Sequence, residues 1–406
     1  MISPGSGLRP IEVASGLVFG TEPAGEPVGA VPPIEIRGVL EDSVRPALAR
    51  PPCLVSFSGG RDSSCVLALA ASVARREGLP LPIPATLRFP GLPESDENDW
   101  QERVVRHLGL DDWIRVEAGD DLDVIGSVAR AVLAEHGLLW PFNSYVHRPL
   151  AEQAGGGSLL TGVGGDEIFE LMTPHRMHAL LARRARPVPR DVLRVGLGLA
   201  PGRIRRSALR RRSLQLPWLT TAGQAALRRA WGEDEAHVPR RLSARAAWWP
   251  RRRGLRVALR SLSAVAGEDV LLVNPLASPA LAASLLADPE LAFADRAGRL
   301  RSVFGELLFD ALYERRSKAS FNRAFFGSES RAFVQGWEGG GVDTGLVDPS
   351  ALRRAWREPV PDGRTFTLLQ HAWLLTRFAR AGASPLPRAT TRSEDDAAPS
   401  RAEPPA

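Results

Sequence analysis

The sequence predicts an α/β protein in which a parallel, doubly wound sheet is followed by a mainly helical part. From Cys53 to Thr161, short apolar runs alternate with helical patterns at the spacing of a parallel sheet covered by helices on both faces. Two of these runs end in glycine-rich turns, at residues 58–60 and 162–165. After Glu170 the strand pattern stops and an arginine-dense helical pattern begins.

The expected elements follow one another with clear boundaries. Residues 1–33 are rich in glycine and proline and are expected to form an extended arm or a short strand. Apolar residues near helical spacing predict a helix over 34–48, and Gly78 is expected to end the helix that starts near Ser63. The other predicted elements are strands at 53–57, 83–89, 113–116 and 158–161, and helices at 96–108, 122–135 and 144–154.

The second half is expected to cover the sheet with helices. Prolines divide the arginine-dense segment up to Arg260 into short helices. Further helices are predicted over 277–286, 300–315 and 366–380, and the composition of 381–406 is typical of a disordered tail. The predicted division of the chain is 1–33, 34–170, 171–380 and 381–406.

Composition excludes several classes of protein. No apolar stretch is long enough to span a bilayer, and the first residues lack the pattern of a signal peptide. Cys53 and Cys65 are the only cysteines, which favours buried thiols in a reducing compartment over a disulfide framework. We therefore expect a cytoplasmic protein. The net charge is +6, and almost all of the basic residues are arginine. This preference for arginine is typical of a GC-rich genome.

The first glycine turn, Ser-Gly-Gly-Arg-Asp-Ser, follows a predicted strand and opens a helix. Ser58, Gly59 and Gly60 let backbone N–H groups gather around an anion, and the helix beginning near Ser63 adds the positive end of its dipole. Because Asp62 would repel a phosphate, its presence predicts that Mg²⁺ bridges the two. The turn predicts a site for Mg-pyrophosphate or a Mg-nucleotide, and it matches neither the Walker loop nor the dinucleotide fingerprint.

The second glycine turn predicts a partner for Asp62. Gly164 and Gly165 follow the strand predicted at 158–161, and Asp166 comes directly after them. Because the carboxyl ends of parallel strands meet at one edge of a sheet, Asp62 and Asp166 are expected to lie close together. Two carboxylates suit a Mg²⁺ ion that takes its remaining ligands from phosphate and water.

Lys318 is the only lysine in the chain. In a sequence that otherwise uses arginine, a single retained lysine indicates chemistry that a guanidinium cannot perform. Lysine is a compact point charge whose pKa shifts easily, whereas arginine is planar and stays protonated. The sequence therefore predicts a catalytic role for Lys318.

Taken together, these motifs resemble the synthetase domain of the asparagine synthetase family, whose relatives include β-lactam synthetases and lasso-peptide macrocyclases. The resemblance covers about residues 34 to 330. The matching segments are Ser58–Ser63, Pro93–Glu97, Gly162–Glu167 and Arg316–Phe321, the last with Ser320 where the family has glycine.

The resemblance implies an ATP-pyrophosphatase-type sheet and an enzyme that uses ATP and Mg²⁺ to form an amide through an acyl-adenylate, with release of AMP and pyrophosphate. Asp62 and Asp166 would bind Mg²⁺, and Lys318 would stabilise charge on the adenylate and on the tetrahedral intermediate. The residues that would bind ATP are Ser58, Gly59, Gly60, Asp62, Ser63, Gly164 and Gly165.

Three departures from the family bear on the substrate. Ile2 stands where full synthetases have the cysteine of a glutaminase domain, so glutamine hydrolysis is not expected. The family's Pro-Phe-Leu-Asp segment is degenerate as Asn274–Ala277, and its preceding acidic residue falls at Val270, with Glu268 and Asp269 out of register.

These departures leave the substrate open. The carboxylate could belong to aspartate, to a molecule that closes a ring with its own amine, or to a peptide side chain in natural-product biosynthesis, and the amine could be ammonia. A precursor peptide or a separate partner protein would fit such a pathway. Two alternatives are an inactive scaffold and a tRNA-modifying ATP pyrophosphatase with a basic surface at Arg203–Arg212 and Arg251–Arg256. We do not expect nucleic acid as a partner, because zinc-type cysteine pairs are absent from the sequence.

Overall fold

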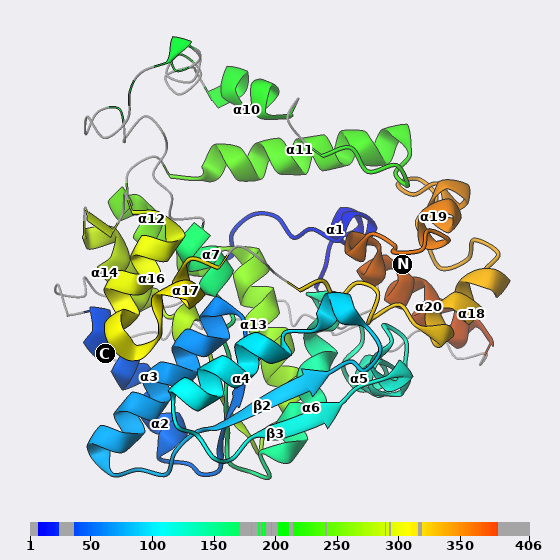
Figure 1. Ribbon diagram of the computed structural model, residues 1–406. Coiled ribbons are helices and arrows are strands. Elements are labelled where there is room, and N and C mark those ends of the chain that lie inside the picture. The colour runs from blue at the N-terminus through cyan, green and yellow to red at the C-terminus, as the bar shows by residue number, and fades with distance from the viewer. Residues whose placement is uncertain are drawn as a thin grey trace, which may run out of the picture.

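The computed structural model describes the greater part of the chain. The described residues are 7–23, 36–170, 202–210, 214–239, 242–288, 290–291, 294–315 and 319–380, with single positions at 180, 186, 188, 189, 191 and 196. Within them, a parallel sheet lies at the base of the view and helices surround it (Figure 1).

The sheet has five strands in the order β3-β2-β1-β4-β5, and every pair is parallel. The strands are β1 (Cys53–Ser56), β2 (Ile83–Arg88), β3 (Ile114–Glu117), β4 (Ser158–Leu160) and β5 (Leu271–Val273). The chain builds outward from β1 to β3 and then returns to place β4 on the other side of β1. The strand order therefore reverses between β1 and β4, where α/β sheets of this kind bind ligands. The predicted parallel α/β fold is confirmed.

Helices cover both faces of the sheet, as predicted. On one face, Cys53 and Val55 share a core with α2 (Ile36–Leu48) and α3 (Arg61–Glu77). On the other face, Leu54 packs with residues of α6 (Arg148–Gln153) and α13 (Arg253–Ala266). Because side chains alternate along a strand, consecutive residues of β1 supply the two cores.

Three helices predicted as continuous are interrupted. The segment predicted at 144–154 begins in a 3₁₀ helix (Phe142–His147) and continues as α6 (Arg148–Gln153). The segment predicted at 122–135 contains a short 3₁₀ turn (Asp120–Leu122) and then α5 (Ser127–His136), and a Cβ at Gly126 would lie 2.3 Å from the Asp120 carbonyl oxygen. The segment predicted at 300–315 contains α16 (Arg296–Phe304), which ends at Gly305 with a φ of 53°, and then α17 (Asp310–Tyr313). Gly126 caps the N-terminus of α5, so that helix begins later than predicted, whereas Gly305 ends α16 early.

The N-terminal segment differs from the extended arm or strand that its composition predicts. Its residues Pro10–Ser15 form helix α1, in which Glu12 is fully buried. The indole Nε1 of Trp218 donates to the Ala14 carbonyl over 2.8 Å. Helix α1 therefore belongs to the core, and this expectation was wrong because its apolar residues pack against segments distant in sequence.

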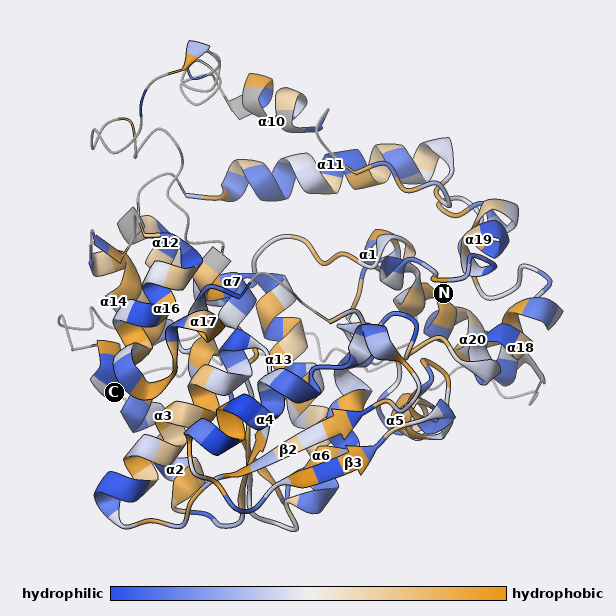
Figure 2. Cartoon of the chain, viewed as in Figure 1, coloured by the Kyte–Doolittle hydropathy of each residue, from blue (hydrophilic) through white to orange (hydrophobic). Residues whose placement is uncertain are grey.

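The remaining helices, apart from α4 between β2 and β3, follow β4 in the chain. A core distinct from that of the sheet joins residues of the N-terminal segment to the buried Trp218, Trp337 and Trp356. Figure 2 shows α14 and α20 carrying many apolar residues, whereas the long α11 alternates polar and apolar ones. These helices are α4 (Asn98–His107), α7 (Gly165–Glu170), α10 (Gly202–Arg210), α11 (Thr221–His237), α12 (Leu242–Trp248), α14 (Pro279–Ala287), α18 (Ser328–Gly336), α19 (Pro349–Trp356) and α20 (Phe366–Arg380).

The structure bears on two of the predictions made from composition. Cys53 and Cys65 are both buried free thiols, as predicted. In the part of the chain that the structure describes, every helix is too short or too polar to cross a bilayer. The division of the chain at residue 170 stays a prediction.

Candidate active site

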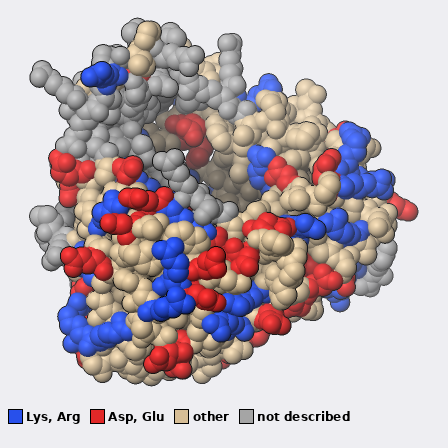
Figure 3. All heavy atoms as spheres, viewed as in Figure 1, with Lys and Arg blue, Asp and Glu red and all other residues tan. Residues whose placement is uncertain are grey.

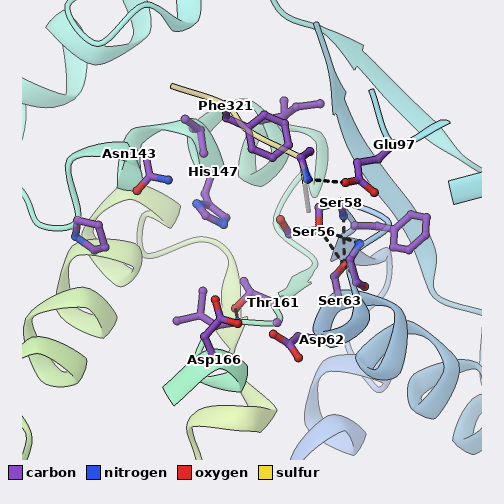
Figure 4. A pocket seen from close by; sticks show the side chains of 18 of the residues that line it. Ser56, Ser58, Asp62, Ser63, Glu97, Asn143, His147, Thr161, Asp166 and Phe321 are labelled. Carbon is purple, nitrogen blue, oxygen red and sulfur yellow. Dashed lines mark hydrogen bonds between the residues drawn. The ribbon is translucent and has the colours of Figure 1, made fainter. Parts of the chain in front are cut away.

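A cavity of about 940 Å³ opens at the carboxyl ends of the central strands, and both glycine turns line it. Figure 4 shows Ser58, Asp62 and Ser63 on one side of this cavity and Thr161 and Asp166 on another. The predicted site residues on its wall are Ser58, Gly60, Asp62, Ser63, Gly164 and Asp166. The two turns, about a hundred residues apart in sequence, therefore meet at one rim.

The first turn joins β1 to the N-terminus of α3. The Ser58 N–H donates to Ser63 Oγ over 3.2 Å, and the Gly60 N–H donates to Ser58 Oγ over 3.3 Å. Gly59 has a φ of 78°, and a Cβ there would lie 2.7 Å from Cγ of Gln101. The 17-residue helix α3 directs its N-terminus at the cavity, which favours an anion.

The second turn packs directly against the first. A Cβ at Gly165 would lie 2.4 Å from Cγ of Asp62, and a Cβ at Gly164, where φ is 97°, would lie 2.8 Å from the backbone nitrogen of Ala277. Only glycine allows these approaches without displacing backbone or carboxylate. The degenerate segment Asn274–Ala277 thus lies beside the second turn, and the Asn274 side chain contacts Thr161.

Asp62 and Asp166 converge on the guanidinium of Arg296. One nitrogen of Arg296 lies 2.8 and 2.7 Å from the two oxygens of Asp62, and the other lies 2.7 Å from Oδ1 of Asp166. Burial raises the pKa of Asp62, while Arg296 acts in the opposite direction. Burial would lower the pKa of Arg296, but the two carboxylates raise it. Sequence analysis missed Arg296, since nothing distinguishes it from the many other arginines.

The position between Asp62 and Asp166 suits a cation, because the structure places a guanidinium there. Among the described residues, no cluster of three or more histidine, cysteine or acidic side chains could hold a metal. Two carboxylates nevertheless match Mg²⁺ that is bound together with a nucleotide, since phosphate and water supply the other ligands. The residues present therefore fit a nucleotide-bound Mg²⁺.

Lys318 lies outside the described residues, but described residues on both sides of it contact Glu97, and one of them, Arg315, also contacts the first turn. The Ala319 N–H donates to Glu97 Oε1 over 2.8 Å, and Arg315 pairs with the same carboxylate. Arg315 also donates to the Gly59 carbonyl over 3.0 Å. Both members of this ion pair are buried. Glu97 therefore fastens the chain on both sides of residues 316–318 to the rim of the cavity.

A second wall of the cavity is aromatic. Phe142 and Phe325 have ring centroids 5.9 Å apart, and Phe321 stacks on Phe325 at 6.2 Å. His147 lies on this side and points into the cavity in Figure 4. Burial lowers the pKa of His147, so its imidazole is neutral near pH 7, and Nδ1 lies 3.4 Å from the Ser144 carbonyl. Sequence analysis found no role for His147, because a lone histidine in a helical segment carries no pattern.

Some of the arginines proposed as a nucleic-acid surface form ion pairs within the protein. Arg253 is buried and pairs with Glu12, while Arg256 lies 2.9 Å from Glu22. On the face shown in Figure 3, basic and acidic side chains are interspersed. These pairings weaken the alternative of a basic RNA-binding surface at Arg251–Arg256.

Comparison with known proteins tests the family directly. The asparagine synthase family model matches residues 35–379, which is most of the chain. A search of curated proteins finds no match. The family match extends past the last predicted motif, through Phe325 of the aromatic wall and on to α20, and it implies ATP-dependent amide ligation. The chain therefore belongs to the asparagine synthase family.

Proposed function

We propose that the protein is an AMP-forming amide ligase that activates a carboxylate with ATP and transfers the acyl group to an amine or ammonia. The observation that carries this proposal is the meeting of Asp62 and Asp166 on one cation at the rim formed by the two glycine turns. Such a rim serves ATP pyrophosphatases because it gathers N–H donors, a helix N-terminus and a metal site around one phosphate chain.

Each part of the rim has a proposed task. Ser58, Gly60 and Ser63 bind the pyrophosphate moiety of ATP through hydroxyl and N–H groups. Asp62 and Asp166 hold Mg²⁺, which when bound supplies positive charge next to the phosphates.

The proposed reaction has two steps. A carboxylate oxygen bonds to the α-phosphorus of ATP while the bond to the pyrophosphate oxygen breaks, which gives an acyl-adenylate. The amine nitrogen then bonds to the acyl carbon, and AMP leaves with the electron pair of the broken C–O bond. Lys318 is proposed to offset the negative charge that develops in both steps.

The proton of the attacking amine needs an acceptor, and we propose Nε2 of His147. When Nδ1 carries the hydrogen that faces the Ser144 carbonyl, Nε2 has a free lone pair. His147 is neutral near pH 7 because burial lowers its pKa, and it lines the cavity opposite the phosphate rim. A neutral imidazole can take the amine proton as the C–N bond forms.

The aromatic wall favours one substrate class among the alternatives. Free aspartate carries an ammonium and a second carboxylate, and buried charges need partners. The wall formed by Phe142, Phe321 and Phe325 suits a bulkier, less polar acyl group. A peptide or natural-product carboxylate, including one that closes a lasso-type ring, is therefore the proposed substrate, and aspartate is the alternative.

An ATP–pyrophosphate exchange assay against a panel of carboxylates, followed by product mass, tests the proposal. Asp62→Asn and Asp166→Asn are expected to abolish exchange, with Asp310→Asn on α17 as the control. Lys318→Arg is expected to suppress mainly the amide product. His147→Gln is expected to retain exchange and to lose roughly 10²–10⁴-fold in amide formation, with the exposed His237→Gln as its control.

Three outcomes would contradict parts of this proposal. Formation of ADP instead of AMP would exclude the adenylate route. Exchange that survives both aspartate substitutions would remove the metal site from the mechanism. Unchanged amide formation in the Lys318 or His147 variant would refute the role assigned to that residue.

A further inference from the structure

Arg296 occupies the position that the proposed metal would take. We propose that Arg296 is an internal counter-cation that Mg²⁺ and ATP displace together, and that its guanidinium then binds the phosphates of the nucleotide. This inference rests on the proposed ATP and Mg²⁺ site, and it assigns to Arg296 a binding role that the sequence motifs do not contain.

The first step of the argument is that Arg296 and Mg²⁺ need the same oxygens. The guanidinium takes both oxygens of Asp62 and Oδ1 of Asp166, all within 2.8 Å. Mg²⁺ binds carboxylate oxygens at roughly 2.0–2.1 Å in strict octahedral geometry. The two cations cannot use these oxygens at the same time, so they compete.

The second step concerns where Arg296 goes. Its side chain is 12% exposed, and a cation at that depth is stabilised by anionic contacts, of which Mg²⁺ would take those to Asp62 and Asp166. Arg296 is the first residue of α16, whose N-terminus is capped by the Asp295 side chain, so the proposed displacement requires a rotation of the side chain and no movement of the helix. The side chain lines the same cavity as the first glycine turn. A guanidinium binds phosphate oxygens with two parallel hydrogen bonds, which makes the triphosphate a suitable new partner.

The consequence is coupled binding. Mg²⁺ alone would displace Arg296 without offering it a new anion, and ATP alone would face Asp62 and Asp166 without a metal. When both bind, the carboxylates receive Mg²⁺ and the guanidinium receives phosphate. Mg²⁺ and ATP are therefore expected to strengthen each other's binding, with a coupling in the range of roughly 5–150-fold.

Binding measurements on the full chain test this coupling without depending on turnover. The variant is Arg296→Met, which keeps side-chain length and removes the charge. The matched control is Arg301→Met on the same helix, whose guanidinium contacts Asp310 and Glu314 at the surface over 2.8 and 2.9 Å. The probes are Mn²⁺ alone, followed by electron paramagnetic resonance, and ATP with and without Mg²⁺, followed by calorimetry.

We expect Arg296→Met to bind Mn²⁺ alone about tenfold more tightly and Mg-ATP about tenfold more weakly, each a change of about 1.4 kcal/mol. The coupling between metal and nucleotide should shrink accordingly, and Arg301→Met should match the wild type. Arg296→Lys keeps the charge without the paired donors, and it should stay close to the wild type for Mn²⁺ but bind Mg-ATP more weakly. If Arg296→Met does not fold, Arg296→Lys still tests the contact with phosphate.

Each result decides a separate point. Unchanged Mn²⁺ affinity in Arg296→Met would overturn the competition, and unchanged Mg-ATP affinity would overturn the contact with phosphate. Failure of the proposed function would look different, because wild-type protein would then bind no Mg-ATP and form no AMP, whatever residue stands at 296.

Discussion

Gly59 and Gly60 are neighbours in sequence and differ sharply in what they tolerate. Gly59 has a φ of 78° and meets Gln101, whereas Gly60 has a φ of −71° and an added Cβ would meet only the Ser58 hydroxyl, at 3.2 Å. A backbone conformation that L residues rarely adopt is thus confined to one of the two glycines. The motif in the sequence marks both, but the geometry distinguishes them.

Gly59→Ala is expected to lower the free energy of unfolding by about 1–3 kcal/mol, because alanine is strained at that φ and its methyl group displaces Gln101. Gly60→Ala should change it by less than about 1 kcal/mol. Urea unfolding of both variants, with Mg-ATP binding measured in parallel, checks the difference. Equal losses at the two positions would contradict the assignment of the strain to Gly59.

At the scale of elements, ion pairs connect segments that the sheet does not reach. Glu22 follows α1 and receives Arg256 and Arg260 of α13 at 2.9 and 2.7 Å. Mainly because Arg260 hydrogen-bonds its charged form, the pKa of Glu22 falls from 4.5 to about 2. Glu97 makes a similar connection between the start of α4 and the chain at Arg315 and Ala319. These carboxylates fix the N-terminal segment and the rim of the cavity in place.

Glu22→Gln is expected to lower stability at pH 7 by about 1 kcal/mol, since the pair is partly exposed and screened by solvent. A depressed carboxyl pKa contributes stability that is complete above the unfolded value and is lost on acidification. The difference between wild type and variant should therefore shrink as pH falls from 4.5 toward about 2. Urea midpoints over a pH series check this, with the exposed Glu152→Gln as control, and a difference independent of pH would exclude the mechanism.

At the scale of the whole molecule, two hydrophobic cores stabilise the described part of the chain. The sheet core contains β1, α2 and α3, and the second core joins α1 to α20 and to Trp218. The buried pair Glu12–Arg253 spans 241 residues and lies between the N-terminal segment and α13. The stability of the part of the molecule that carries the aromatic wall therefore depends on the N-terminal residues.

Arg253→Met is expected to cost about 3–5 kcal/mol, because it leaves the Glu12 carboxylate buried without its partner. Glu12→Gln combined with Arg253→Met should cost less than the sum of the single variants, since the uncompensated charge is gone. A double-mutant cycle in urea measures this interaction. Additive losses would show that the two residues act independently.

Local patterns account for what the sequence predicted well. Strands β1 to β4, α3 with its end at Gly78, and the two glycine turns depend on residues close in sequence, and the parallel sheet follows from their alternation. The convergence of Asp62 and Asp166 followed from the rule that strand ends share one edge. The roles of Lys318 and the ATP-binding residues stay predictions.

Tertiary structure decided the features that no local pattern carries. Strand β5 is three residues long and exists because β4 offers it a partner, and α1 is helical in a segment whose glycines and prolines favoured an arm. Arg296 contacts Asp62, which is 234 residues away in sequence. His147 lines the cavity only in the folded chain, together with residues that are distant in sequence. The sequence thus determined the sheet, its glycine turns and the family, because those depend on neighbours along the chain. The folded structure decided which cation faces the carboxylates and what lines the opposite wall, because those depend on contacts between distant segments.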